Sequence, residues 1–163
     1  MIPRTGYSRL QIFLHWTVAL LFLCQFLFSD AMNQAARAVR HGTEPVVDAM
    51  VWQHILFGVL VLGFALWRLS LRREGGAPQA EHDGSALQEL AARLTHAGLY
   101  LTMILLPVSG LVAWFGGVEA AGTAHQLAKM AFIAFFALHV VGAAFNQFWL
   151  RNGLIWRMVR AGR

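Results

Sequence analysis

Four long stretches of the sequence are apolar and contain no Asp, Glu, Lys or Arg. They run between Arg9 and Asp30, between Asp48 and Arg68, between Arg93 and Glu119, and between Lys129 and Arg151. A helix needs about 20 apolar residues to cross the hydrocarbon core of a bilayer. We therefore expect membrane-spanning helices at about residues 10–29, 50–67, 94–115 and 121–150. This pattern predicts an all-α integral membrane four-helix bundle, formed as one transmembrane domain of residues 1–163.

The segments between these stretches carry signals of their own. Residues 30–48 are polar and long enough for a short amphipathic helix across the outer mouth of the bundle. Residues 72–78, with two glycines and a proline, predict a loop. Ser85 and Gln88 have the spacing of a capping box, which indicates a helix that begins there and continues into the third span. Pro107 lies inside that span, where a membrane helix tolerates it and usually bends.

The chain has a formal net charge of +5, which by itself would permit a nucleic-acid partner. The positions of the basic residues give a different explanation. Most of them flank the inner ends of the predicted helices: Arg4, Arg9, Arg68, Arg72, Arg73, Arg93, Arg151, Arg157, Arg160 and Arg163. Only Arg37, Arg40 and Lys129 fall on the other side. This asymmetry places both termini and the middle loop in the cytoplasm, so the charge is a topology signal and no nucleic acid is expected.

Histidines occur at two depths of the predicted bundle. His125 and His139 are fourteen residues apart, which is close to four helical turns and about 21 Å of rise. Their imidazoles therefore lie on nearly the same helix face at opposite depths of a core about 30 Å thick. A polar ring inside a membrane helix is costly unless it has a partner. This pair indicates ligands for two metal centres arranged across the membrane.

Each of the other spans adds one histidine to these two levels. His54 shares the outer level with His125, whereas His15 and His96 share the inner level with His139. His15 matches the depth of His139 better than His96 does, although geometry alone leaves the choice between them open. A single histidine such as His96 also suits a hydrogen bond to a neighbouring helix. His41 and His82 fall in predicted loops, where we expect them to be solvated.

The ligand types favour haem over zinc or copper. Neutral imidazole binds all three, but the predicted spans offer no Asp, Glu or second Cys as a further ligand at membrane depth. Cys24 is the only cysteine, and we expect it to be a small buried apolar residue. Bis-histidine haem b inside a four-helix bundle fits better. Arg68 and Arg9 are placed to pair with haem propionates, although Arg68 equally suits a cytoplasmic anchor.

The residues also carry a family resemblance. Tyr7-Ser8-Arg9-Leu10-Gln11-Ile12 followed by His15-Trp16, then His54, His96 with Leu106-Pro107-Val108-Ser109-Gly110, and the His125/His139 pair, resemble prokaryotic cytochrome b561 proteins. The resemblance implies a multi-pass protein of the bacterial inner (cytoplasmic) membrane with two haem b groups per chain. It implies an outer haem between His54 and His125 and an inner haem between His15 and His139. It leaves His96 for a quinone site on the cytoplasmic side.

Two functions are compatible with that resemblance. The first is a superoxide:ubiquinone oxidoreductase, in which His96 serves ubiquinone and Lys129, one turn from His125, helps Arg37 and Arg40 to attract superoxide at the outer mouth. The second is a cytochrome b electron-transfer subunit that docks a periplasmic dehydrogenase, hydrogenase or other redox protein. Under both interpretations, membrane lipid and quinone are partners of the chain.

Overall fold

The computed structural model describes residues 6–75 and 85–162 of the chain. In this part every regular element is helical, which confirms the all-α fold. The elements in order are α1 (Arg9–Leu27), α2 (Asp30–Arg40), α3 (Ala49–Gly75), α4 (Ala86–Gly116), α5 (Glu119–Ala144), a π-helical segment η1 (Phe145–Trp149) and α6 (Leu154–Arg157).

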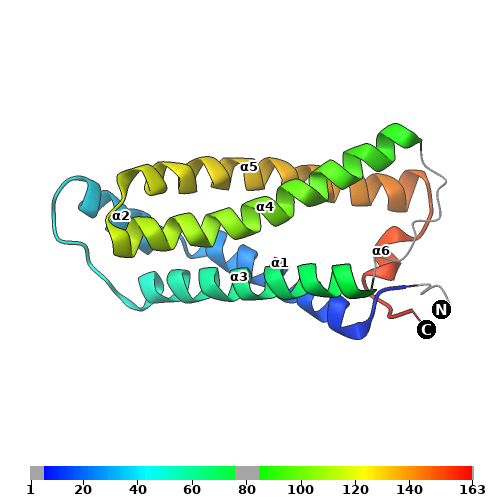
Figure 1. The fold of residues 1–163 in the computed structure, drawn as a ribbon, viewed down its shortest axis with the longest axis horizontal. Coiled ribbons are helices and arrows are strands. Elements are labelled where there is room, and N and C mark those ends of the chain that lie inside the picture. The colour runs from blue at the N-terminus through cyan, green and yellow to red at the C-terminus, as the bar shows by residue number, and fades with distance from the viewer. Residues whose placement is uncertain (1–5, 76–84, 163) are drawn as a thin grey trace.

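The four long helices run along the length of the molecule (Figure 1). Each of α1, α3, α4 and α5 is long and apolar enough to cross a membrane, and the protein is a membrane protein. Both termini lie at one end of the bundle, and α2 lies at the other end with the turn between α4 and α5 (Figure 1). We name these the inner end and the outer end, after the topology expected from the charges.

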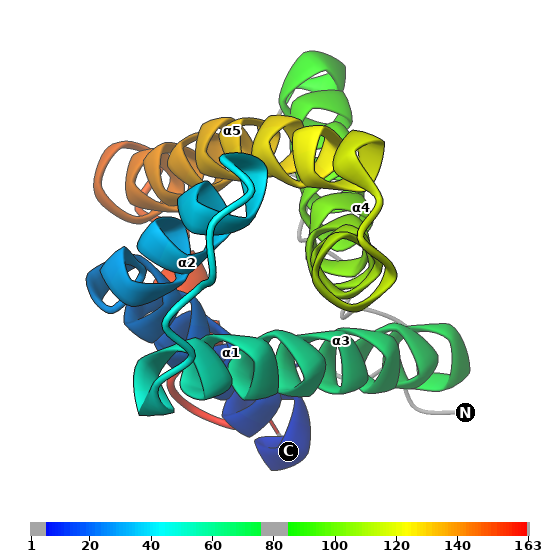
Figure 2. The same cartoon turned by 90° about the vertical axis from the view of Figure 1, so that its left-hand side faces the viewer.

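Seen from the outer end, α1, α3, α4 and α5 follow one another around the bundle axis (Figure 2). The main packing contacts are between α4 and α5, between α3 and α4, and between α1 and α3. Gly98 of α4 lies directly under the ring of Phe135 on α5, with no room for a side chain of its own. Close approach of these two helices therefore depends on a residue without a Cβ atom.

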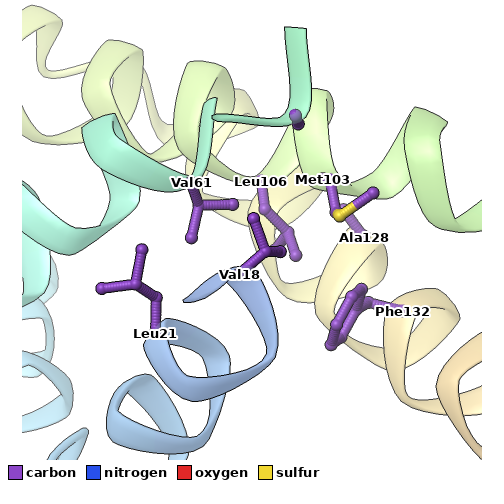
Figure 3. Close-up of a cluster of buried hydrophobic side chains, with 8 residues drawn as sticks. Val18, Leu21, Val61, Met103, Leu106, Ala128 and Phe132 are labelled. Atoms are coloured by element: carbon purple, nitrogen blue, oxygen red, sulfur yellow. The ribbon is translucent and has the colours of Figure 1, made fainter. Parts of the chain in front are cut away.

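The buried core takes residues from all four long helices (Figure 3). Its members are Val18, Leu21, Val61, Ala65, Met103, Leu106, Ala128 and Phe132. Many other large apolar side chains face outward, for example Leu20, Leu56 and Leu101, each more than half exposed. A water-soluble protein does not normally cover its surface in this way, whereas a bilayer provides the apolar solvent that such side chains need.

Several boundaries differ from the sequence prediction. The loop predicted over residues 72–78 is wrong for Arg72 to Gly75, because α3 continues through them, and residues 76–78 lie outside the described part. Leucine and arginine are good helix formers, so the helix continues beyond its apolar stretch. The fourth span is α-helical only to Ala144 and then becomes η1. His82, Arg4 and Arg163 lie outside the described residues.

Two local predictions are confirmed. The Ser85 hydroxyl accepts a hydrogen bond from the Gln88 backbone N–H at 3.4 Å, and the Gln88 side chain accepts one from the Ser85 N–H at 2.8 Å. This capping box begins α4, and Ser8 with Gln11 forms a second one at the start of α1. The polar segment after α1 contains the amphipathic helix α2, as its composition predicted.

The last residues fold back on the first helix, which the sequence did not predict. The Asn146 side chain in η1 donates to the Gly142 carbonyl at 2.9 Å, and Asn152 donates to the Asn146 side chain at 2.7 Å. Beyond α6, the Trp16 indole N–H of α1 donates to the Met158 carbonyl at 2.7 Å. The described chain therefore closes at the inner end, where its first and last segments meet.

Candidate functional site

Three histidines from three helices gather near the inner end of the bundle. The rings of His15 on α1 and His139 on α5 have centroids 6.1 Å apart, and those of His96 on α4 and His139 are 5.2 Å apart. Arg68 on α3 is close enough to act electrostatically on all three imidazoles. The structure therefore brings together the inner histidines that sequence spacing grouped, and it adds Arg68 beside them.

A second group lies near the outer end. His54 on α3 and His125 on α5 interact electrostatically, and Lys129, one turn along α5, acts on both. Lys129 is half-buried, whereas Arg37 and Arg40 are exposed on α2. Of the three cations that the sequence assigned to the outer side, Lys129 is the one the structure places against the histidine pair.

His125 is held in place by the backbone of α4. Its Nδ1 lies 2.8 Å from the Leu106 carbonyl. Because a carbonyl only accepts, Nδ1 carries the proton and donates, and Nε2 of the neutral ring keeps its lone pair outside this contact. A Cβ atom at Gly110 would lie 3.1 Å from Nδ1 and 3.2 Å from Cε1 of this ring. A metal-binding histidine usually donates its other ring N–H to a carbonyl or carboxylate, which fixes the orientation of the ring and its tautomer.

His15 and His54 each carry a buried ring nitrogen without a hydrogen-bond partner in the described structure, the Nδ1 atom in both cases. Beside His54, the Gln25 amide donates to the His54 carbonyl at 2.9 Å, and Gln53 has both amide atoms buried without a partner there. Buried polar atoms are normally satisfied. These side chains therefore indicate a further polar or metal partner inside the bundle.

The inner rings lie close enough together for two of them to hold one metal ion between them. Metal–imidazole bonds of about 2.0 Å place ring centres roughly 6 Å apart across one metal ion. The 6.1 Å separation of His15 and His139 meets this requirement, and the 5.2 Å separation of His96 and His139 is shorter. Within residues 6–75 and 85–162, no three His, Cys, Asp or Glu side chains are placed to hold one metal together. Paired imidazoles fit haem iron better than a tetrahedral zinc site.

Aromatic side chains separate the two histidine levels. Phe132 lies on α5 midway between His125 and His139, and it is 3% exposed. Its ring stacks on Phe22 of α1 at 4.0 Å between centroids, and the Phe136 ring follows at 6.0 Å. The bundle therefore contains two separate polar levels with stacked aromatic rings between them.

A small pocket that the sequence did not predict lies at the inner end. It has a volume of about 220 Å³ and lies between α3 and α4, lined by Leu69, Arg72, Arg93, His96, Ala97 and Tyr100. Arg72 follows Arg68 by one turn, a spacing that could have indicated a second arginine on the same helix face.

Arg9, the other predicted propionate partner, is exposed at the first residue of α1. Two helical glycines lie one turn from a histidine. Gly142, three residues after His139, has open space where a Cβ atom would lie, and a Cβ atom at Gly58, four residues after His54, would make ordinary contact with Gln25 and Pro107. The expectation that Cys24 is buried is wrong, because its side chain is half-buried.

Comparison with known proteins adds an independent finding. Residues 6–161 match the family model of prokaryotic cytochrome b561. The sequence is also similar to cytochrome b562 of Cereibacter sphaeroides, at 36% identity over 160 residues, which cover 98% of this chain and 99% of the relative. The similarity therefore extends over all four long helices and is not confined to the histidines.

Proposed function

The chain belongs to the prokaryotic cytochrome b561 family of membrane electron-transfer haem proteins, and from this premise we propose that it is a superoxide:ubiquinone oxidoreductase of the bacterial inner membrane. It binds two haem b groups and moves electrons from the periplasmic side to quinone. The observation that carries this proposal is the separation of the histidines into two groups at opposite ends of the bundle.

His54 and His125 are the proposed ligands of the outer haem, and His15 and His139 those of the inner haem. The Leu106 carbonyl orients His125, and the 6.1 Å ring separation supports the pairing of His15 with His139. Bound haem supplies a reversible one-electron centre at each level. Arg68, beside the inner histidines, is the proposed partner of a propionate, with Arg9 at the helix end as a second one.

His96 is the proposed quinone-side residue. Its Nδ1 donates to the Ala92 carbonyl at 2.7 Å, so the neutral ring has Nε2 as an acceptor. That atom can take up a proton and release it again, which quinone reduction requires because quinol carries two more protons than quinone. The ring lies against His139, one of the proposed ligands of the inner haem, with 5.2 Å between the ring centroids.

Lys129 is the proposed attractor for superoxide. Its half-buried ammonium acts on both outer histidines, so an anion drawn towards it arrives beside the outer haem site. His54 and His125 would hold the outer haem, and that haem would supply the one-electron acceptor for superoxide. Local positive charge raises the encounter rate of a small anion.

A spectroscopic titration tests the proposal. Purified protein is first analysed for haem per chain, with two haem b as the expected result. Superoxide is then generated in the presence of a short-chain ubiquinone, and haem reduction and quinol formation are followed together. Haem that superoxide does not reduce, while a chemical reductant does, would contradict the oxidase assignment.

The alternative proposal is an electron-transfer subunit, and the outer surface provides an observation in its favour. The helix α2 lies across the outer end and exposes the charged residues Asp30, Arg37 and Arg40. A mixed-charge surface suits a docked protein better than a small anion. Under this alternative, a periplasmic dehydrogenase or hydrogenase reduces the haem and superoxide does not.

A further inference from the structure

The inner pocket between α3 and α4 combines two guanidinium groups with an apolar wall. Along both helices the arginines lie closest to the inner end of the bundle. Arg72 is three residues nearer that end than Leu69, and Arg93 is seven residues nearer than Tyr100. The pocket therefore has a charged part at the level of the helix ends and an apolar, aromatic part deeper in the membrane.

Both arginines are exposed and can reach a ligand at the membrane surface. Arg93 forms an ion pair with Glu89 one turn earlier on α4. A guanidinium has five N–H donors, so one carboxylate leaves donors for a second anion. Arg72 adds another planar fork of donors, and two such groups around one pocket match the oxygen atoms of a phosphate.

Tyr7 extends this polar surface from the N-terminal segment. Burial raises the pKa of its phenol above the usual value, while the nearby Arg72 guanidinium acts in the opposite direction. The phenol consequently stays protonated at neutral pH and remains a hydrogen-bond donor. Tyr100, which lines the pocket, lies close enough to Tyr7 to act on it electrostatically.

The surroundings of the pocket suit a lipid. Leu66, one turn deeper than Leu69 on α3, and Leu101, the residue after Tyr100 on α4, are 49% and 57% exposed, and both lie along the outward apolar surface. Acyl chains attached to a headgroup in the pocket can lie over these side chains. Basic pockets between transmembrane helices on the cytoplasmic side are known to hold anionic headgroups.

We propose that this pocket binds a phosphate group, and that an anionic phospholipid headgroup supplies it. Arg72 and Arg93 bind the phosphate oxygens, and the glycerol part lies against Leu69 and Tyr100. Ubiquinone is a weaker match for the charged part, because its headgroup is neutral and offers only acceptor oxygens. The inference does not rest on the proposed function, because lipid binding is measured without electron transfer.

The test uses the purified holoprotein, freed of lipid in mild detergent and examined by native mass spectrometry. Phosphatidylglycerol, phosphatidylcholine and inorganic phosphate are added in separate arms. We expect one phosphatidylglycerol per chain, bound at least about tenfold more tightly than either of the others. Arg72→Gln and Arg93→Gln should each weaken it by about tenfold or more, since each removes charge-assisted hydrogen bonds.

The matched control is Arg73→Gln. Arg73 is the next residue on α3, carries the same charge and does not line the pocket, so its loss should leave phosphatidylglycerol binding unchanged. Haem content verifies that each variant is folded, and Arg72→Lys retains the charge should Arg72→Gln not fold. The site is overturned if Arg73→Gln weakens phosphatidylglycerol binding as much as Arg72→Gln and Arg93→Gln do. It is also overturned if Arg72→Gln and Arg93→Gln lose binding of short-chain ubiquinone and keep that of phosphatidylglycerol. Inorganic phosphate that binds as tightly as the lipid overturns the lipid assignment.

Discussion

At the residue scale, five histidines on the four long helices form two groups, His54 with His125 near the outer end and His15 and His96 with His139 near the inner end. The fourteen-residue interval places His125 and His139 at two levels, and the structure groups the remaining three histidines as their depths indicated. Spacing did not predict the Leu106 carbonyl that orients His125, nor Tyr100 beside Arg72. Those contacts depend on how each helix is rotated against its neighbour, and a periodic pattern does not fix that rotation.

The outer ligand pair is tested by single substitutions. His54→Ala or His125→Ala should reduce haem from two to one per chain, because one imidazole cannot keep iron six-coordinate and low-spin. The inner haem should survive, since Phe132 and Phe22 separate the two levels. Haem analysis together with reduced-minus-oxidised spectra measures the loss. An unchanged haem content in either variant would show that this pair is assigned wrongly.

His96 is expected to serve quinone and not iron. His96→Ala should keep both haems, because His15 and His139 already provide the spacing for two axial bonds, and it should slow quinone-linked reoxidation about tenfold or more. Stopped-flow reoxidation by a short-chain ubiquinone measures the rate. Disappearance of the inner low-spin signal would instead identify His96 as the partner of His139.

At the element scale, apolar runs bounded by charge predicted the four long helices well, because crossing a bilayer leaves little choice of structure. The helix ends were less predictable. α3 continues through Arg72 and Arg73, and η1 interrupts the fourth span at Phe145. The hydrogen bond from Trp16 to Met158 joins residues 142 positions apart, and no local pattern carries that information.

The contact between α4 and α5 predicts a specific effect at Gly110. In Gly110→Ala the new methyl group lies about 3 Å from the His125 ring, as the positions of Nδ1 and Cε1 require. The ring has to move by a few tenths of an ångström and loosens its bond to the Leu106 carbonyl. We expect the outer haem to show a shifted spectrum and about tenfold weaker retention, because His125 loses the carbonyl that orients its ring.

Gly63→Ala is the control for this substitution. Gly63 is also a helical glycine, but a Cβ atom there meets nothing within 4 Å. Spectrum and haem retention should therefore match the wild type in this variant. An identical change in both variants would mean that helix stiffness, and not the His125 contact, controls the outer site.

At the scale of the whole molecule, charge and fold divide the protein into two ends. The inner end collects most of the arginines and the chain termini, whereas the outer end has few cations and four acids, Asp30, Glu44, Asp48 and Glu119. Net charge at the outer end is therefore not positive. Attraction of superoxide then depends on the position of Lys129 and not on a general surface field.

This dependence predicts the effect of salt. The rate of superoxide-driven haem reduction should fall between 0.01 M and 0.1 M ionic strength, because the Debye length decreases from about 30 Å to about 10 Å. At low salt, haem reduction should be slower in Lys129→Glu than in the wild type. The rate in Lys129→Gln should lie between those of the wild type and Lys129→Glu. A rate that does not depend on salt and is the same in Lys129→Glu as in the wild type would contradict the attraction of superoxide by Lys129. It would favour a docked protein as the electron donor.

The closure of the inner end by the last residues has a consequence for biosynthesis. α1 enters the membrane first. The Met158 carbonyl, which accepts from the Trp16 indole of α1, and the Gly162 N–H, which donates to the Tyr7 carbonyl, become available only after those residues have been translated. His15 and His139 likewise enter the membrane almost a whole chain apart. On the proposed pairing, the inner site is therefore assembled only once α5 has followed α1, α3 and α4 into the membrane, and cofactor loading there comes after the insertion of all four long helices.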